Sequence, residues 1–363
     1  MDAKVRERFE RVHDFVAGRR ERALYVLDPP PPAKGEVPPH LDQPVGRIIA
    51  DGELQLRRQL WDNERRLAMP GEEDYVPVLQ PYIGTGVLAS AFGAPTYFAD
   101  DRDPWTRPFI RKAEEALALR APKADAGLLA EVLRRTRRMR QVAGPGYPIA
   151  MTDLQSPLDT AMLLWDQADL FLSMVLEPKA VHHVCRLVAD LTVEFVHRQR
   201  EAAGGAFSPL HWPRFGWPDG AGIGVSDDIL PLIGPKQYEE FGLPYLARLS
   251  EAFGGIMVHS CGKFTQNLPV LARLPGLRML NFGATEQPVA DAARGLPREV
   301  IICPHLGLNK DLHFDTPEGY VDHCFAAMDD VRRLWLMVWN VPTVEAWAAL
   351  AARIRARAAG KHV

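Results

Sequence analysis

The sequence predicts an α/β fold, a (β/α)8 TIM barrel at residues 71–363 that follows an N-terminal helical extension at residues 1–70. Three observations predict it. Between residues 235 and 358, four short apolar runs alternate with amphipathic stretches, and four successive strand–helix units imply a parallel sheet. Earlier apolar runs at 75–79, 147–151, about 206–211 and 222–225 bring eight strands within reach. The length of 363 residues suits one barrel domain.

The extension is expected to be helical because amphipathic stretches at 2–20 and 44–69 flank a short apolar run and a proline cluster. Residues 29–32 are all proline, which excludes a helix and favours an extended linker. Within the barrel, the apolar runs predict strands at 255–258, 278–281, 299–303 and 334–338. The amphipathic pattern predicts helices at 178–203, 235–253, 264–273, 287–294, 316–329 and 343–358.

The composition excludes several classes of protein. A net charge of −3 argues against a general binder of nucleic acids or anionic membranes. No apolar run approaches the roughly 20 residues that a membrane helix needs. The first 22 residues are charged throughout, unlike a signal peptide. The four cysteines are too few and too scattered for a disulfide framework, so we expect a cytoplasmic protein with reduced thiols.

The strongest candidate for a chemical site is the pair His259 and Cys261 at the end of the strand predicted at 255–258. Side chains alternate along a strand, so these two point the same way. Imidazole nitrogen and thiolate sulfur are good zinc ligands. The simpler interpretation is an inert cysteine beside a hydrogen-bonded histidine. The position at a strand's carboxyl end, where α/β folds place their chemistry, favours a site.

Other polar residues follow predicted strands. Asp153 is either a helix N-cap or a substrate contact, and Asp227 and Asp228 either orient a ligand or cap the following turn. The irregular, aromatic-rich stretch 207–228 is expected to form a lid or pocket wall, or else a surface loop packed on the barrel. Side chains at the strand ends are expected to line a pocket at the carboxyl-terminal face; they are Asp153, Asp227, His259, Cys261, Asn281, His305 and Trp339.

Several motifs together resemble the uroporphyrinogen decarboxylase superfamily, and in particular its cobalamin-dependent methyltransferase branch. The resemblance covers roughly residues 75–350. It rests on Ala91-Phe92-Gly93-Ala94, Asp153 with Pro157 to Ala161, Pro178 to His182, Ser226-Asp227-Asp228, Gly234-Pro235 with Tyr238 to Phe241 and Pro244, His259-Ser260-Cys261-Gly262, and Thr316-Pro317-Glu318. The family fold is a (β/α)8 barrel with an N-terminal helical extension, which agrees with the prediction above.

The resemblance separates two branches. Uroporphyrinogen decarboxylases carry an N-terminal Arg-Gln-Ala-Gly-Arg segment, but the matching region here reads Met-Pro-Gly-Glu-Glu at residues 69–73. The methyltransferase branch binds zinc through His-x-Cys and a distant cysteine. His259 and Cys261 match the first two ligands, but residues 338–340 at the third position read Val-Trp-Asn. Cys303 or His305, at the end of the neighbouring strand, is therefore the expected third ligand, and Glu286 could add an oxygen.

The resemblance implies a zinc-dependent methyltransferase that moves a methyl group between a corrinoid, or a methoxylated substrate, and a thiol-type acceptor. The implied partners are a small-molecule substrate and a corrinoid protein, with no nucleic acid and no membrane; a homodimer is left open. Asp153 and Asp227 are the candidate catalytic residues, and the candidates for substrate binding are His211, Trp217, Asn281 and Trp339. Two alternatives remain: a metal-free carboxy-lyase, with Arg214 as its main cationic candidate, and a catalytically silent barrel that binds a small molecule.

Overall fold

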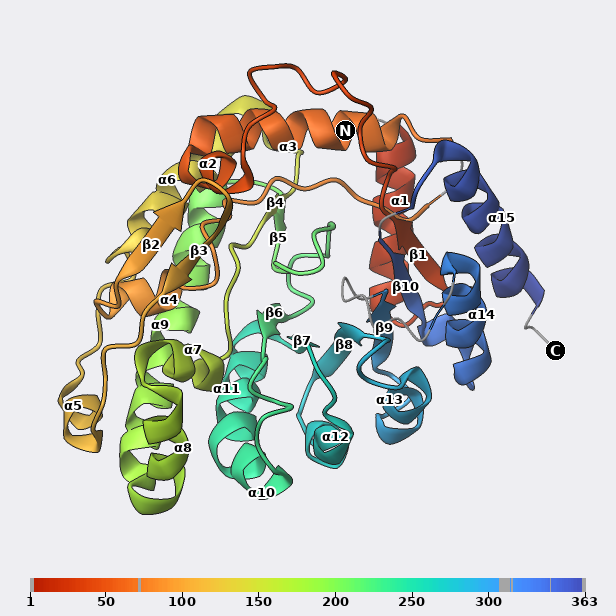
Figure 1. Ribbon diagram of the computed structural model, residues 1–363. Coiled ribbons are helices and arrows are strands. Elements are labelled where there is room, and N and C mark those ends of the chain that lie inside the picture. The colour runs from red at the N-terminus through yellow and green to blue at the C-terminus, as the bar shows by residue number, and fades with distance from the viewer. Residues whose placement is uncertain (1–2, 71–72, 307–313, 315, 340, 361–363) are drawn as a thin grey trace.

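The computed structural model describes residues 3–70, 73–306, 314, 316–339 and 341–360. Its centre is a six-stranded parallel sheet in the order β1-β10-β9-β8-β7-β6 (Figure 1). The strands are β1 (Leu24–Leu27), β6 (Ile223–Ser226), β7 (Ile256–Ser260), β8 (Leu277–Gly283), β9 (Ile301–His305) and β10 (Trp335–Val338). The predicted α/β fold with a parallel sheet is thereby confirmed.

Hydrogen bonds continue this sheet on its other side. The Gly224 amide donates to the Pro209 carbonyl, just after β5 (Phe207–Ser208), and β5 pairs in parallel with β4 (Ile149–Ala150). Leu79 pairs in parallel with Ile149, and the Asp74 amide donates to the Tyr25 carbonyl of β1. Backbone hydrogen bonds therefore lead from β6 through β5, β4 and residues 74–79 to β1. This arrangement is consistent with the predicted barrel.

Strand β1 is the main difference from the predicted elements. The apolar run at 24–27 was placed in the helical extension, but it pairs with β10 over its whole length. All four of its residues are buried, because the strand has neighbours on both edges and side-chain layers on both faces. Residues 71–72, at the predicted boundary between extension and barrel, lie outside the described part of the chain.

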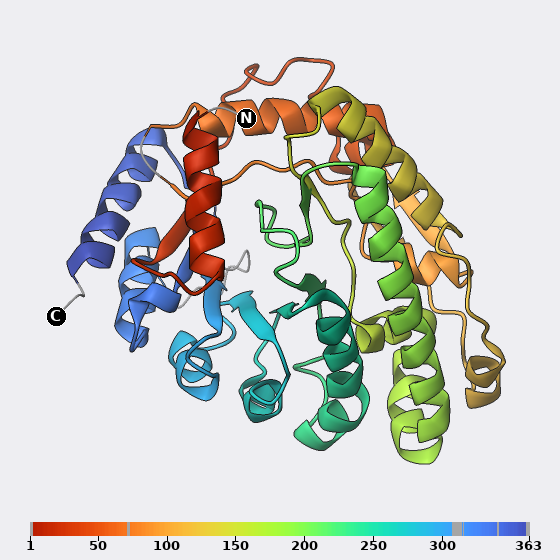
Figure 2. The same ribbon diagram turned by 180° about the vertical axis from the view of Figure 1, so that it is seen from behind.

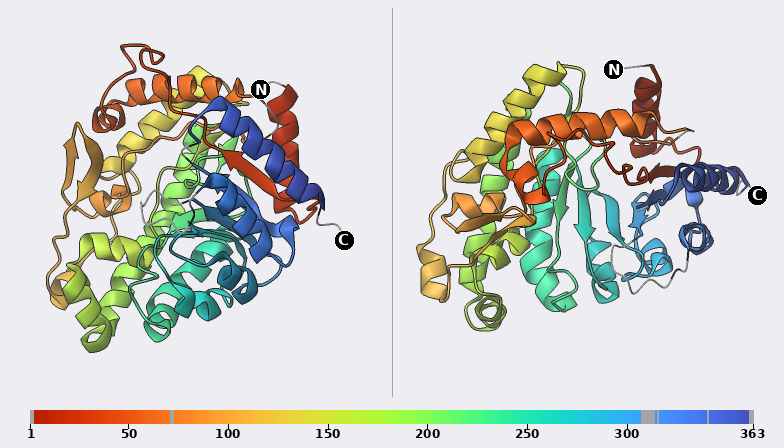
Figure 3. Two further views of the ribbon diagram at one scale, coloured as in Figure 1. Left: turned by 45° about the vertical axis from the view of Figure 1, so that its right-hand side comes forward. Right: turned by 45° about the horizontal axis from the view of Figure 1, so that its top comes forward.

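Helices surround the strands (Figure 1). The helix predicted at 44–69 is two, α2 (Val45–Ala50) and α3 (Gly52–Leu67), because Asp51 is extended and its carboxylate caps α3. The remaining helices are α1 (Ala3–Val16), α4 (Val87–Ala91), α5 (Ala113–Ala118), α6 (Leu128–Ala143), α7 (Pro157–Leu164), α8 (Gln167–Leu176), α9 (Pro178–Ala203), α10 (Pro235–Gln237), α11 (Leu243–Phe253), α12 (Leu268–Leu271), α13 (Val289–Gly295), α14 (Pro317–Ala327) and α15 (Val344–Gly360). Strands β2 (Thr96–Ala99) and β3 (Arg102–Thr106) form an antiparallel hairpin at the edge of the molecule (Figure 3).

Two hydrophobic clusters follow from the alternation of side chains along the strands. In β1, Tyr25 and Leu27 belong to a large cluster that also contains apolar residues of the surrounding helices. Leu24 and Val26 belong to a second cluster with alternate residues of β7 to β10. Helix α1, red in Figure 2, contributes Val12, Phe15 and Val16 to this second cluster. Phe15 meets Trp335 edge to face. Among the described helices, none is both long enough and apolar enough to cross a bilayer.

Candidate functional site

The candidate residues lie side by side because the strands are in register. His259 of β7 is paired with Ser226 of β6 and with Asn281 of β8, and Asn281 is paired with Cys303 of β9. All four positions are near the carboxyl ends of their strands. The sheet therefore holds these side chains at one level, on the face where parallel α/β folds place their sites.

Three potential metal ligands converge at this edge. Asp228, His259 and Cys261 each offer one ligand atom, and these atoms lie within 4.8 Å of one another; no other such group occurs among the residues that the structure describes. The Sγ atom of Cys261 is 3.5 Å from Nε2 of His259. The Cys261 amide donates to Oδ1 of Asp228 at 2.8 Å, which ties the aspartate to the strand tip. Carboxylate, imidazole and thiol together form a donor set that suits a divalent transition metal.

Asn281 determines which nitrogen of His259 is available. Its Nδ2 donates to the Cys303 carbonyl at 2.6 Å, so its Oδ1 faces Nδ1 of His259 at 2.7 Å. Because an amide oxygen only accepts, Nδ1 of His259 must donate, and the neutral ring then carries its lone pair on Nε2. That lone pair is on the nitrogen nearer to Cys261. The arrangement matches the outer-shell hydrogen bond that metal-binding histidines usually make.

Cys303 and His305, the candidates for a third ligand, lie outside this group. Cys303 is fully buried in the second hydrophobic cluster, where its sulfur is 3.4 Å from Nδ2 of Asn281. His305 is stacked on Trp339, with ring centroids 4.4 Å apart. Burial, together with the nearby His259, lowers the pKa of His305 to about 3. The third member of the convergent group is Asp228, and Glu286 accepts a hydrogen bond from the Gly262 amide.

The surroundings of Cys261 favour the protonated form of its thiol. Burial is the main cause, and the carboxylates of Asp228 and Glu286 add to it, which together raise the pKa of Cys261 to about 12. Thiolate formation at neutral pH therefore needs a compensating positive charge. A divalent cation between Cys261 and Asp228 would supply that charge.

The two candidate catalytic aspartates differ in access. Asp227 is fully buried and accepts hydrogen bonds from the hydroxyls of Ser156 at 2.5 Å and Tyr238 at 2.6 Å. Burial raises its pKa to about 6. Asp153 is partly exposed and accepts from Nε2 of Gln155 at 2.9 Å. Asp227 is thus enclosed by its hydroxyl partners, whereas Asp153 retains access to solvent.

The four residues predicted to bind substrate lie in different environments. His211 is buried, with Nδ1 3.0 Å from the Gly224 carbonyl and Nε2 3.0 Å from the Ser226 hydroxyl. Trp217 is fully buried and stacks on Trp335 in the second hydrophobic cluster. Trp339 lines the main cavity, and Asn281 supports His259 as described above. Trp217 is therefore a residue of the hydrophobic core, whereas Trp339 lies at the cavity surface.

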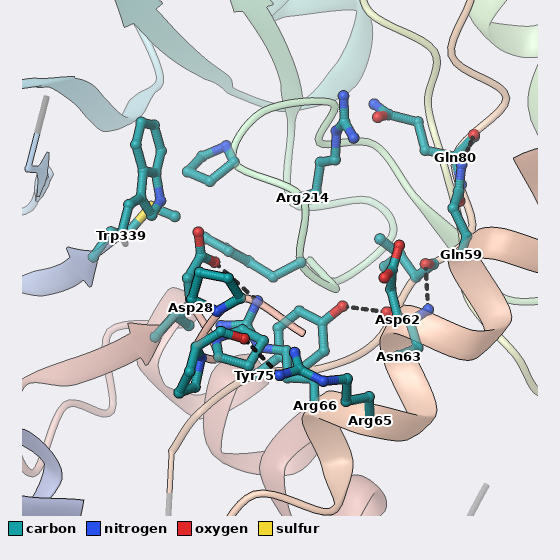
Figure 4. A pocket seen from close by; sticks show the side chains of 18 of the residues that line it. Asp28, Gln59, Asp62, Asn63, Arg65, Arg66, Tyr75, Gln80, Arg214 and Trp339 are labelled. Carbon is teal, nitrogen blue, oxygen red and sulfur yellow. Dashed lines mark hydrogen bonds and ion pairs between the residues drawn. The ribbon is translucent and has the colours of Figure 1, made fainter. Parts of the chain in front are cut away.

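A cavity of about 600 Å³ lies next to this group (Figure 4). Three of the residues that line it directly follow strands or extended segments: Asp28 follows β1, Gln80 follows residues 75–79, and Trp339 follows β10. Trp212, also in the wall, has its ring centroid 5.2 Å from that of Trp339 and 6.0 Å from that of His259. Trp212 therefore connects the cavity to the candidate metal ligands. The full lining is Val26, Asp28, Pro29, Pro30, Pro31, Pro32, Gln59, Asp62, Asn63, Arg65, Arg66, Tyr75, Val78, Gln80, Trp212, Pro213, Arg214, Phe215, Met337 and Trp339.

Trp212, Gln80 and Asp28 line the cavity but are not among the candidate site residues predicted from the sequence. Trp212 lies in the aromatic stretch 207–228 that was expected to form a pocket wall, so the stretch was identified but not the residue. Asp28 follows an apolar run, as residues at strand tips do, and that run was assigned to the extension. Asn340, in the segment where the resemblance places the distant cysteine, lies outside the described residues.

Comparison with known proteins adds two findings. Residues 82–210 match the family model for uroporphyrinogen decarboxylase (URO-D). The structure resembles a methyltransferase from Methanosarcina mazei with a TM-score of 0.70 and 14% sequence identity, over 96% of this chain and 98% of that chain. At this identity the likeness shows a shared fold. None of the curated proteins matches the sequence. The chain is thus similar to the uroporphyrinogen decarboxylase family over residues 82–210, and it shares the fold of the methyltransferase over nearly its whole length.

Proposed function

We propose that the protein is a zinc-dependent methyltransferase that moves a methyl group between a corrinoid, presented by a partner protein, and a thiol-type acceptor. The observation that carries the proposal is the convergence of Asp228, His259 and Cys261 at the strand tips beside a large cavity. The printed name of the structural neighbour, a methyltransferase, supports the type of reaction.

The donor types of the three residues, and the spacing of two of them, support a zinc site. Bonds of about 2.0–2.3 Å in a tetrahedral site place ligand atoms roughly 3.3–3.8 Å apart. The distance of 3.5 Å between Sγ of Cys261 and Nε2 of His259 falls in that range. Three protein ligands leave one coordination position open, as in catalytic zinc sites. When bound there, zinc would hold the thiol of an acceptor as a nucleophilic thiolate at neutral pH.

The protein's own groups prepare this position. Asn281 keeps the lone pair of His259 on Nε2, and the Cys261 amide orients the carboxylate of Asp228. Cys261 must lose its proton when a metal binds, so metal affinity should rise with pH. Trp212 and Trp339 form an apolar wall beside His259, which limits the access of water to the acceptor.

The proposal is tested with free methylcobalamin as methyl donor and 2-mercaptoethanol as acceptor. The methyl group forms a bond to sulfur, and the electron pair of the broken bond stays on cobalt, so the product cob(I)alamin is followed by its absorption under anaerobic conditions. We expect about one zinc ion per chain and thiol-dependent demethylation. Removal of the metal with a chelator should abolish the reaction, and added zinc should restore it.

The matched variants are Cys261→Ser and Cys185→Ala. Cys261 belongs to the convergent group, whereas Cys185 is buried in the main hydrophobic cluster. Cys261→Ser should lose most of the zinc and the demethylation, and Cys185→Ala should retain both. A wild-type protein that binds no zinc, or a zinc-loaded protein that never methylates a thiol, would contradict the proposal.

A further inference from the structure

Among the charged side chains that line the cavity, one cation has no ion pair with a described residue, and one anion shares its cation with a second carboxylate. Five ionisable side chains other than tyrosine line it: Asp28, Asp62, Arg65, Arg66 and Arg214. Three of the five form ion pairs with residues outside the lining. Asp62 accepts from Nε of Arg58 through both oxygens at 3.1 Å, and Arg65 donates to Glu36 at 2.8 Å. Arg66 donates to both oxygens of the buried Glu73.

Arg214 is the remaining cation. No carboxylate among the residues described in the structure lies within ion-pair distance of it. Its guanidinium lies instead over the rings of Tyr82 and Trp212, at 4.9 and 5.9 Å from their centroids. These rings hold the side chain without neutralising it. Arg214 is also exposed, so its remaining donors are free to meet a ligand in the cavity (Figure 4).

Asp28 is the remaining anion. Its nearest cation is Arg66 at 3.4 Å, which is already engaged by Glu73 and by the Leu27 carbonyl. The side chain of Asp28 is 42% exposed, but this surface faces a concave cavity whose walls restrict hydration. That burial raises the pKa of Asp28, and the attraction of Arg66 and Arg214 offsets the effect only in part. A ligand cation would complete the compensation.

A neutral polar group adds to this pattern. Gln80 lines the cavity and is buried, and its Oε1 has no hydrogen-bond partner among the described residues. Its Nε2 is fully used, because it donates to the carbonyls of Met151 and His211. The amide is therefore held with its acceptor unpaired. An unpaired buried acceptor is costly, and a donor in the cavity would remove that cost.

From these observations we infer that the cavity binds a small zwitterion of the amino-acid class, with its carboxylate at Arg214 and its ammonium group at Asp28. That the ligand also carries a thiol rests on the proposed function, in which the methyl acceptor is then a thiol-bearing α-amino acid. Trp212 lies between the charged part of the cavity and the candidate metal ligands, since its ring centroid is 5.9 Å from the guanidinium of Arg214 and 6.0 Å from the ring centroid of His259. A ligand bound by its two charges thus extends a short side chain along Trp212 towards Cys261.

The test uses calorimetric titration with three matched probes. L-homocysteine carries both charges, 4-mercaptobutanoate lacks the ammonium group, and 3-aminopropanethiol lacks the carboxylate. L-methionine, which carries both charges but no thiol, is titrated into metal-free protein. It separates this inference from the proposed function, because its binding needs neither zinc nor methyl transfer. Both zwitterions should bind about 10- to 100-fold more tightly than the singly charged probes.

The variants Arg214→Gln and Asp28→Asn assign the two ends. Arg214→Gln should weaken L-methionine and 4-mercaptobutanoate about 10- to 100-fold and leave 3-aminopropanethiol unchanged. Asp28→Asn should weaken L-methionine and 3-aminopropanethiol and leave 4-mercaptobutanoate unchanged. Arg65→Gln is the matched control, because Arg65 lines the same cavity but is paired with Glu36. Thermal melts check that each variant folds.

Two outcomes would overturn the inference. In the first, 4-mercaptobutanoate binds as tightly as L-homocysteine and Asp28→Asn has no effect, so the ligand is a simple anion. In the second, L-methionine does not bind to metal-free protein at all. The second outcome leaves the proposed function standing if thiol-dependent demethylation is observed, so the two failures are distinguishable.

Discussion

Nδ1 of His259 lies 2.7 Å from Oδ1 of Asn281, and this contact fixes the tautomer of a candidate metal ligand. Replacement of Asn281 by leucine removes the acceptor and lets the imidazole turn or change tautomer. We expect Asn281→Leu to weaken zinc binding by about 10- to 100-fold. Competition with a chromophoric chelator at fixed pH measures the effect. Asn281→Asp keeps an acceptor for Nδ1 and should lose less; equal affinities for all three proteins would contradict the role of Asn281.

The second prediction concerns the third ligand. Asp228 belongs to the convergent group, whereas Cys303 is buried in the core and His305 is stacked on Trp339. Asp228→Asn should therefore lower the zinc content at limiting metal, while Cys303→Ser and His305→Gln should retain it. Elemental analysis after dialysis against a weak chelator measures the content. Loss of zinc in Cys303→Ser with retention in Asp228→Asn would restore the assignment made from the sequence.

Much of the fold could be predicted because β6 to β10 are short apolar runs separated by helices, which is the sequence signature of a parallel sheet. Strand β1 was not assigned to the sheet. Its sequence Leu-Tyr-Val-Leu is apolar enough, but the four prolines that follow it favoured a linker. The partner of β1 is β10, more than 300 residues later, and no local pattern reveals such a pairing.

The candidate site shows a similar limit. Asp227 and Asp228 are adjacent at the end of β6, and adjacent residues direct their side chains differently. Asp227 is enclosed by Ser156 and Tyr238, whereas Asp228 approaches Cys261. The sequence pattern pointed to the pair of acids and Asp227 was named as the catalytic candidate, but no local signal showed that Asp228 is the acid that approaches Cys261. The same holds for Trp212 and Trp217, because the stretch 207–228 has no periodicity from which burial could be read.

The third prediction concerns the pH dependence of stability. His211 is buried between Gly224 and Ser226, and burial lowers its pKa below the ordinary value of 6.5. The unfolded chain therefore binds a proton near pH 6.5 that the folded protein does not. Stability is retained above that pH and lost as the pH falls below it, by up to about 1.4 kcal/mol per pH unit for one proton.

His211→Gln should remove this contribution while its amide can still donate to the Gly224 carbonyl. Urea unfolding of the wild type and the variant at pH 7.5 and pH 5.5 measures it. The wild type should lose more stability on acidification than the variant does. His13→Gln serves as control, because His13 is exposed on α1. Equal losses in the wild type and His211→Gln would show that His211 is protonated in the folded protein.

The last prediction concerns the turn that follows Cys261. Gly262 has a φ of +79°, in the left-handed region, and its amide donates to Glu286 at 2.7 Å. A Cβ atom at this position would lie 3.0 Å from Cγ of Pro231. Gly262→Ala therefore combines backbone strain with a tight contact, and we expect it to lower the free energy of unfolding by about 1–3 kcal/mol.

Gly93→Ala is the matched control, because Gly93 has a φ of +97° and nothing within 4 Å of an added Cβ. Urea unfolding should show a larger loss for Gly262→Ala than for Gly93→Ala, the difference being the cost of the contact with Pro231. Because Gly262 directly follows Cys261, Gly262→Ala should also weaken zinc binding, whereas Gly93→Ala should not. Equal stability losses and unchanged zinc affinity in the two variants would mean that the turn does not position the thiol.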